Sequence, residues 1–272
     1  MEFIRPFDPT KNFDTGFPGY EAQFLAHLED AVMIASHIKA GGCGPHLHYH
    51  RSDQVYCLMR GGMTVRLGNE VHVIDAPTLV FIPAGLPHCN WNATTDLETH
   101  FEMIVPAPLP TDQIVFFVDS MDSVPAEDRA KCAGYVRPVD QSATTEPMPG
   151  FRTQALADRS TGSTNAVVYY AEVDPGNGGP DCHIHEFDQY YLVLEGQLTV
   201  EVALETHVVG PDTLVVLPAG VPHRQYNAGD TTEKHIAVLT PAPAEGRPWD
   251  RGVAFAANGV DEVGVIAPAG KV

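Results

Sequence analysis

Two short stretches of the chain gather side chains that could bind a metal ion. Both read His-x-His-x3-Gln, and both stand just before an apolar run that ends at a glycine. Alternate residues of a β-strand point to the same face, so the two imidazoles of each pair project together. Imidazole nitrogen suits zinc, iron, nickel and copper, and an amide oxygen extends the range toward Mn²⁺ and Fe²⁺. The residues are His48, His50 and Gln54 in one stretch, and His183, His185 and Gln189 in the other.

The two stretches belong to a longer internal duplication. Matching residues lie 135 positions apart, as from His48 to His183 and from His88 to His223. The match runs without a gap to the Pro-Ala-Pro stretches at 106–108 and 241–243, and an upstream piece at 18–26 recurs at 149–157. So many specific residues in register predict a duplicated domain. His88 and His223, each from a more distant strand, are expected to complete the two metal sites.

A structural explanation of the histidines competes with this one. A single buried histidine is more often a hydrogen-bonded core residue than a ligand, and the repeat could preserve sites that no longer bind metal. A purely structural repeat would explain its glycines and prolines, but it gives no reason to keep three histidines and a glutamine in each copy. We therefore expect one divalent metal ion per copy.

The elements around these residues read as β-strands. The runs at 31–42, 54–74 and 78–88, and their counterparts at 166–177, 189–209 and 213–223, are rich in β-branched and apolar residues and are broken by turn signals. Short strands with turns about every ten residues predict an all-β fold with a jelly-roll barrel in each copy. The best candidate for a helix is 123–136, and 252–256 is expected to form a strand that packs back on the barrel.

Amino-acid composition excludes some classes of binding partner. The chain of 272 residues has 16 basic and 35 acidic residues, a net charge of −19, which argues against nucleic acid or an anionic membrane surface as partner. The N-terminus lacks the pattern of a secretory signal, and no apolar run is long enough to span a membrane. The five cysteines lack metal-site spacing. A soluble cytoplasmic protein with reduced thiols and a small-molecule substrate is expected.

Each copy resembles a cupin domain. The first cupin motif is G-x5-H-x-H-x(3,4)-E-x6-G and the second is G-x5-P-x-G-x2-H-x3-N. The chain matches most of the first motif at His48–Gly61 and His183–Gly196, and most of the second at Pro83–Asn92 and Pro218–Asn227. The resemblance implies a bicupin: two conical double-stranded β-helix (jelly-roll) barrels with the metal inside. The expected bounds are an N-terminal cupin domain over 1–122, a linker over 123–148, a C-terminal cupin domain over 149–243 and a tail over 244–272.

The chain departs from the cupin pattern in two ways. Pro77 and Asp212 stand where the second motif opens with glycine, a change that affects only a turn. Both copies also carry glutamine where the family most often has glutamate. Glutamine offers an acceptor oxygen but no usable base. A site of three histidines and one glutamine therefore leaves the full charge on the ion, and proton transfer must use another group.

Several duplicated polar residues could supply that group. Tyr56 and Tyr191 lie on the ligand face by strand parity, and His100 and His235 are candidate bases; these four are the predicted catalytic residues. Asn90 and Gln225 follow the later histidines by two positions. For all six, filling a gap in the core is an equally good interpretation. His72 and His207, like Asp53 and Asp188, are more typical of hairpins and turns.

The resemblance implies a metal-dependent enzyme, and it leaves the reaction open. The first hypothesis is an O2-using dioxygenase similar to quercetinase and the pirins, acting on an enolisable small molecule, with Fe²⁺ favoured and Ni, Mn, Zn, Co or Cu as alternatives. The second is a non-redox isomerase or cyclase of a 2-oxo acid or polyketide-like substrate, as in the bacilysin-pathway isomerase. The third is a cupin that binds a small molecule without catalysis. Homodimers are common in the family.

Overall fold

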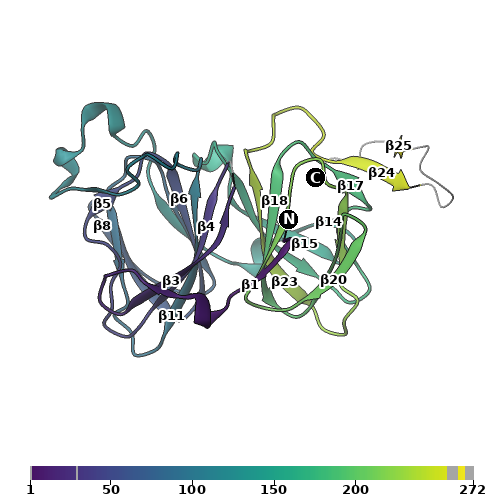
Figure 1. Cartoon of the computed structure of the whole chain (residues 1–272), viewed down its shortest axis with the longest axis horizontal. Coiled ribbons are helices and arrows are strands. Elements are labelled where there is room, and N and C mark those ends of the chain that lie inside the picture. Colours follow the sequence, from purple (N-terminus) through teal and green to yellow (C-terminus); the bar gives the residue numbers. More distant parts are fainter. Residues whose placement is uncertain (1, 29, 256–262, 267–272) are drawn as a thin grey trace. The chain divides into compact units, whose positions relative to one another are not determined.

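The computed structural model describes residues 2–28, 30–255 and 263–266, with no account of the side chains of Phe255 and 263–266. The described chain is built of β-strands and contains no α-helix. Five single 3-10 turns interrupt the strands: η1 (Pro9–Lys11), η2 (Met121–Ser123), η3 (Ala126–Asp128), η4 (Gln141–Ala143) and η5 (Arg159–Thr161). None of the described segments is a helix that could cross a membrane. The all-β prediction is confirmed (Figure 1).

The chain folds into two compact units. The N-terminal unit comprises 7–139 and 156–165, and the C-terminal unit comprises 1–6, 140–155 and 166–272. The first six residues thus belong to the C-terminal unit, where β1 (Ile4–Pro6) pairs with β21 (Thr213–Leu217). No turn or periodicity signal in the sequence pointed to that strand.

The N-terminal unit has two antiparallel sheets. The larger has the order β13 (Tyr135–Pro138), β9 (Thr78–Ile82), β6 (Asp53–Arg60), β11 (Glu98–Val105), β4 (Val32–Ile38), β3 (Tyr20–His27) and β2 (Phe13–Asp14). The smaller has the order β12 (Phe116–Phe117), β5 (His48–Tyr49), β10 (His88–Trp91), β7 (Gly62–Leu67) and β8 (Glu70–Asp75).

The core of this unit joins the two sheets. Tyr56, Leu58, Val80 and Ile82 of the larger sheet share one buried cluster with Met63, Val65, Leu67 and Ile74 of the smaller. These residues alternate along their strands, so each strand turns its apolar face to the other sheet. Of the metal-ligand candidates, Gln54 lies on β6 within this core, and His48 and His88 lie on β5 and β10 of the smaller sheet, where both are buried.

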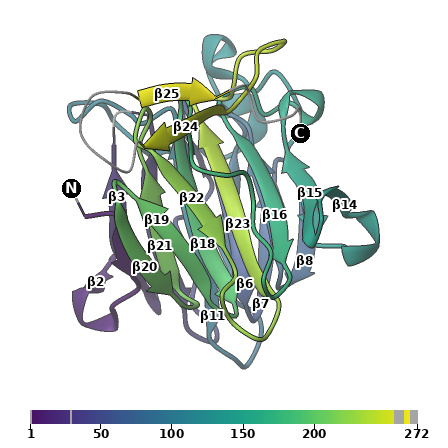
Figure 2. The same cartoon turned by 90° about the vertical axis from the view of Figure 1, so that its right-hand side faces the viewer.

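The C-terminal unit repeats this arrangement (Figure 2). Its larger sheet has the order β1, β21, β18 (Asp188–Glu195), β23 (Glu233–Thr240), β16 (Val167–Val173), β15 (Phe151–Ala157) and β14 (Thr145–Met148). Its smaller sheet has the order β20 (Glu205–Val209), β19 (Leu198–Val202), β22 (His223–Tyr226), β17 (His183–Ile184), β24 (Arg251–Phe255) and β25 (Val263–Ile266). A cluster of Tyr191, Val193, Val200, Val215 and neighbouring residues forms its core.

Two sequence-based expectations about secondary structure have different outcomes. The strand expected near 252–256 is confirmed as β24, which pairs with β17; residue 256 lies outside the described residues. The helix expected over 123–136 is wrong. The segment forms η3 and the start of β13, which pairs with β9. The end of the segment is extended because Tyr135 pairs with Phe81 and Val136 pairs with Val80 in the larger sheet.

The glycine that ends each first motif has a steric reason. Gly61 and Gly196 adopt φ of +73° and +75°, a region that L side chains rarely occupy. A Cβ on Gly61 would lie 2.7 Å from the carbonyl oxygen of Leu97, and one on Gly196 would lie 2.9 Å from the Cα of Glu233. Only glycine lets the strand turn so close to its neighbour.

Gly196→Ala should lower the free energy of unfolding by at least about 1–2 kcal/mol, because left-handed backbone and a backbone clash are both introduced. Gly210→Ala is the matched control, since a Cβ there meets nothing within 4 Å. Urea-induced unfolding of both variants measures the difference. Equal stability of the two variants would contradict this account of the turn.

Candidate metal centres

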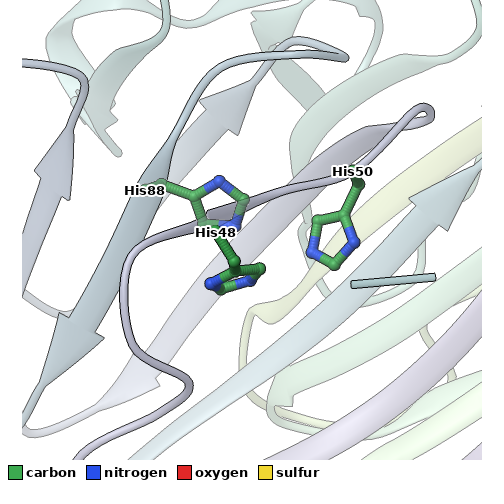
Figure 3. A group of neighbouring side chains, drawn as sticks. All are labelled: His48, His50 and His88. Carbon is green, nitrogen blue, oxygen red and sulfur yellow. The ribbon is translucent and has the colours of Figure 1, made fainter. Parts of the chain in front are cut away.

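Three histidines converge in the N-terminal unit. His48 on β5 pairs directly with His88 on β10, and His50 follows β5 by one residue. One ring nitrogen of each histidine lies within 4.8 Å of the others, and all three residues are buried. Figure 3 shows the three rings turned toward a common point. The buried Gln54 lies nearby, at the start of β6.

Backbone carbonyls fix the orientation of these rings. Each Nδ1 lies within hydrogen-bond distance of a carbonyl oxygen, so Nδ1–H donates and Nε2 keeps its lone pair. Burial is the main reason why the pKa of His48 falls to about 4 and that of His88 falls well below its usual value. The rings are therefore neutral near pH 7, as ligands must be. The contacts are His48 to His46 at 2.7 Å, His50 to Ile114 at 2.7 Å, and His88 to Leu86 at 2.9 Å.

The atoms that face the centre have no hydrogen-bond partner. Nε2 of His50, Nε2 of His88 and Oε1 of Gln54 are all buried and unpaired in the structure. An unpaired buried acceptor costs roughly 1–3 kcal/mol, so several together require compensation. A divalent cation held by these acceptors would provide it, and the residues present thus fit a metal ion.

The C-terminal unit assembles the same set. His183 on β17 pairs with His223 on β22, and one nitrogen from each of these residues and from His185 lies within 4.8 Å of the others. Burial is the main cause that lowers the pKa of His185 and His223. Nδ1 again faces a carbonyl in each ring: Asp181 at 2.8 Å for His183, Phe187 at 2.6 Å for His185, and Val221 at 2.9 Å for His223.

Gln189 brings its side-chain oxygen into the C-terminal centre. Oε1 lies 3.0 Å from Nε2 of His185 and 3.2 Å from Nε2 of His223. Because Nδ1 carries the proton in both rings, these are contacts between acceptors, which repel unless a cation lies between them. Ligands about 2.0–2.2 Å from a shared ion lie roughly 3–3.6 Å apart, which matches the observed spacing.

Different partners orient the two glutamines. Nε2 of Gln54 donates to Oε1 of Glu102 at 2.5 Å, whose other oxygen accepts from Tyr20 at 3.3 Å. Nε2 of Gln189 donates to the Tyr169 hydroxyl at 3.3 Å. Both arrangements turn Oε1 toward the histidines. A buried carboxylate therefore lies directly behind the amide in the N-terminal unit, whereas a phenol takes that place in the C-terminal unit.

Sequence reasoning missed Glu102, Tyr169 and Asp250, the three residues that distinguish the centres. At the repeat positions of Glu102 and Tyr169 stand Ala237 and Ile34, so a search for duplicated residues discards both. Asp250 follows the end of the repeat. Its Oδ1 lies 3.6 Å from Nε2 of His183. Only alternate-residue parity on β11 and β16 could have suggested the first two.

The predicted catalytic residues lie one layer behind the ligands. The ring of Tyr56 is 4.8 Å from that of His100 and 6.5 Å from that of His88, and Tyr191 lies 4.8 Å from His235. Burial, the largest cause, raises the pKa of Tyr56 and Tyr191 well above 10.0, so both phenols stay protonated near neutral pH. A catalytic role for these four residues stays a prediction.

Each of the two histidines is paired with a buried glutamate. Nδ1 of His100 lies 2.8 Å from Glu98, and Nδ1 of His235 lies 2.9 Å from Glu233. Burial opposes charging of His100, but the carboxylates of Glu98 and Glu102 prevail and raise its pKa to about 9. The imidazole of His100 is therefore protonated and positively charged in the folded N-terminal unit at neutral pH.

The remaining duplicated residues lie in turns, hairpins and strands around the two centres. Asp53 accepts from the amide of Ala84 at 2.8 Å, and Asp188 accepts from that of Ala219 at 2.9 Å, so each fixes a Pro-Ala-Gly turn. His72 and His207 lie beside exposed glutamates on the hairpins. Asn90 on β10 and Gln225 on β22 are buried, and each packs against a glycine, Gly44 and Gly179 respectively.

The N-terminal centre adjoins a cavity. A volume of about 420 Å³ is lined by His50 together with Arg51, Ile104, Leu109, Gln113, Phe116 and neighbouring residues. Arg51 is held there by Asp128 at 3.0 Å. In the C-terminal unit a cavity of about 450 Å³ is lined by Glu186, Phe187, Arg247, Trp249, Arg251 and neighbouring residues; none of the described lining residues is a ligand candidate.

Two sandwiched sheets per unit, with a group of three histidines in each, define a duplicated cupin. The cupin domain model matches residues 35–105 and 169–239, and the chain belongs to that family. The resemblance drawn from the motifs is thereby confirmed. No curated protein sequence matches the chain.

Solved structures share the fold at low sequence identity. A putative glyoxylate induced protein from Pseudomonas aeruginosa has a TM-score of 0.68 at 15% identity, with 89% of this chain and 90% of that chain covered. Oxalate decarboxylase from Bacillus subtilis, a protein with Mn(II) centres, has a TM-score of 0.66 at 14% identity, with 89% and 78% covered. AerE from Microcystis aeruginosa has a TM-score of 0.64 at 14% identity, with 88% and 99% covered.

The buried Glu98–His100 pair should stabilise the protein in a pH-dependent way. Because the folded pKa of His100 is raised to about 9 from 6.5, the stabilisation is complete below about pH 6.5 and is lost as the pH rises through about 9. Glu98→Gln should therefore cost about 1–3 kcal/mol of unfolding free energy at about pH 6 and distinctly less at about pH 10.

Denaturant unfolding at the two pH values measures this difference. Glu70→Gln is the matched control, since the side chain of Glu70 beside His72 is 80% exposed and the change should cost little at either pH. A cost for Glu98→Gln that does not change with pH would contradict the charged state of His100.

Proposed function

We propose that each unit binds one divalent metal ion through three histidines and a glutamine, and that the protein is a metal-dependent dioxygenase that acts on an enolisable small molecule. The observation that carries the metal assignment is the approach of Gln189 Oε1 to two Nε2 atoms, at 3.0 and 3.2 Å. Acceptors that face one another in a buried site favour a bound cation. The proposed ligands are His48, His50, Gln54 and His88 in one unit, and His183, His185, Gln189 and His223 in the other.

Three histidines and a glutamine are uncharged ligands, so a bound ion would keep its full charge and would attract an anionic substrate. A divalent ion there would supply Lewis acidity toward an anionic oxygen such as that of an enolate. We favour Fe²⁺, since imidazole and amide oxygen both suit it, and Mn²⁺ is the first alternative.

The N-terminal cavity is where we place the substrate. It reaches His50, and its apolar side chains, Ile104, Leu109 and Phe116, can cover a ring or an alkyl chain and exclude water. Arg51 lies over the ring of Phe116 at 4.7 Å and is bound to Asp128, so its guanidinium is held at the rim. A volume of about 420 Å³ suits a small molecule.

A non-redox isomerase or cyclase is the second candidate, and one observation favours it. Proton transfer needs a base close to the centre, and the N-terminal unit provides the carboxylate of Glu102 behind Gln54. Burial opposes its ionisation, but His100 and the hydrogen bond from Gln54 lower the pKa of Glu102. An ionised Glu102 could accept the proton of the Tyr20 hydroxyl, which donates to it, while that hydroxyl takes a proton in turn, without any need for O2.

Metal content tests the ligand assignment. The purified protein should bind one divalent ion per unit, and His48→Ala/His88→Ala or His183→Ala/His223→Ala should each abolish one of them, because each pair removes two of four donors. His72→Ala/His207→Ala is the control and should keep both ions, since these duplicated histidines lie on the hairpins. Elemental analysis provides the readout. Full metal content in either ligand variant would refute the assignment.

Oxygen consumption tests the reaction. Protein reconstituted with Fe²⁺, Ni²⁺ or Mn²⁺ should take up O2 with a panel of flavonols and β-diketones, and the rate should fall at least about a hundredfold in His48→Ala/His88→Ala. An oxygen electrode measures uptake. No uptake with any substrate, together with metal-dependent ultraviolet changes in a 2-oxo acid, would replace the dioxygenase with the isomerase.

A further inference from the structure

One acidic side chain reaches the C-terminal centre from outside both cupin motifs. Asp250 directly precedes β24, which pairs with β17 so that Gly252 lies opposite His183 and Arg251 lies opposite Ile184. The amide of Val253 donates to Cys182 at 2.8 Å, and Arg251 forms an ion pair with Glu186. The ladder therefore holds the backbone beside Asp250 in register with a ligand candidate.

The carboxylate of Asp250 faces the ligands. Oδ1 lies 3.6 Å from Nε2 of His183, and the side chain is 13% exposed. Since Nδ1 of His183 faces the Asp181 carbonyl at 2.8 Å, Nε2 is the ring nitrogen that is left to face the carboxylate, as it would in a shared metal site. The 3.6 Å between Nε2 of His183 and Oδ1 of Asp250 is within the range of distances between two ligand atoms that bind the same metal ion.

In the N-terminal unit, a different segment pairs with the strand that carries the first histidine. There β12 pairs with β5, so that Phe117 lies opposite His48 with ring centroids 6.2 Å apart. The repeat position of Asp250 is Val115, and His50 lines a cavity. The two centres share their histidines and glutamine, and they differ in what the segment after the barrel presents to them.

We infer that Asp250 is a metal ligand of the C-terminal centre, which therefore holds a divalent transition-metal ion with three histidines, a glutamine and an aspartate. This inference rests on the proposed metal binding and adds a ligand that neither motif contains. The carboxylate contributes a negative charge and a hard oxygen donor, so the C-terminal centre should bind Mn²⁺ more tightly than the N-terminal centre does.

Variants with a single remaining centre test the ligand. The His48→Ala/His88→Ala protein keeps only the C-terminal centre, and adding Asp250→Asn should raise its Kd for Mn²⁺ by at least about tenfold. Asp250→Glu, which keeps a carboxylate, should weaken binding less than Asp250→Asn does. Titration of Mn²⁺ alone, followed by the electron paramagnetic resonance signal of the free ion, gives the Kd.

The His183→Ala/His223→Ala protein keeps only the N-terminal centre and supplies the control. Asp250→Asn should leave its Kd for Mn²⁺ unchanged, and thermal unfolding of the metal-free proteins verifies that the substitution preserves the fold. Equal weakening in both backgrounds would overturn the inference.

An ion pair between Asp250 and a protonated His183 predicts the opposite sign. In that case Asp250→Asn releases His183, and Mn²⁺ binding at the C-terminal centre is unchanged or tighter, which overturns the assignment of Asp250 alone. If the His48→Ala/His88→Ala protein, with Asp250 intact, binds none of Mn²⁺, Fe²⁺ and Co²⁺, the proposal of a metal site in the C-terminal unit is refuted. The two failures are therefore distinguishable.

Discussion

The structure of each centre depends on hydrogen bonds from ring nitrogens to backbone carbonyls. Six Nδ1 atoms face carbonyl oxygens at 2.6–2.9 Å, and each contact leaves the opposite nitrogen as an acceptor that points inward. Buried acceptors directed at one another are unfavourable unless a cation lies among them. The strand pairs that set His48 against His88 and His183 against His223 thus hold the rings in an arrangement that is costly without an ion. The same carbonyl contacts select the tautomer that binds metal.

The duplication preserves the donors and changes their surroundings. Gln54 is oriented by the carboxylate of Glu102, and Gln189 is oriented by the phenol of Tyr169. A second carboxylate, Asp250, lies beside the C-terminal histidines instead of behind the amide. Glu102 lies behind the amide in one centre and Asp250 lies beside a histidine in the other, and under the proposed ligand set only the C-terminal ion would gain a negatively charged donor. The proposal of Asp250 as a ligand therefore implies that the two centres differ in their affinity for Mn²⁺.

The repeat made most of the fold and the ligand set predictable from the sequence. Residues 135 positions apart had to occupy equivalent places in two barrels, so His88 and His223 could be added to their sites without any structure. A search for duplicated residues, however, cannot find residues that occur in only one half. Glu102 is matched by Ala237, and Asp250 lies beyond the repeat, just before the strand that the sequence predicts at 252–256. The pairing of Ile4 with Val215 spans most of the chain, and local patterns do not encode such contacts.

The central claim is that a metal ion lies among the three histidines of each unit. Anomalous scattering from crystals grown with Co²⁺, recorded above and below the cobalt absorption edge, locates the ion directly. The account predicts one peak within about 2.0–2.3 Å of the Nε2 atoms of His48, His50 and His88, and a second peak at the same distance from those of His183, His185 and His223. Peaks at other positions, or no peak in either barrel, would contradict it.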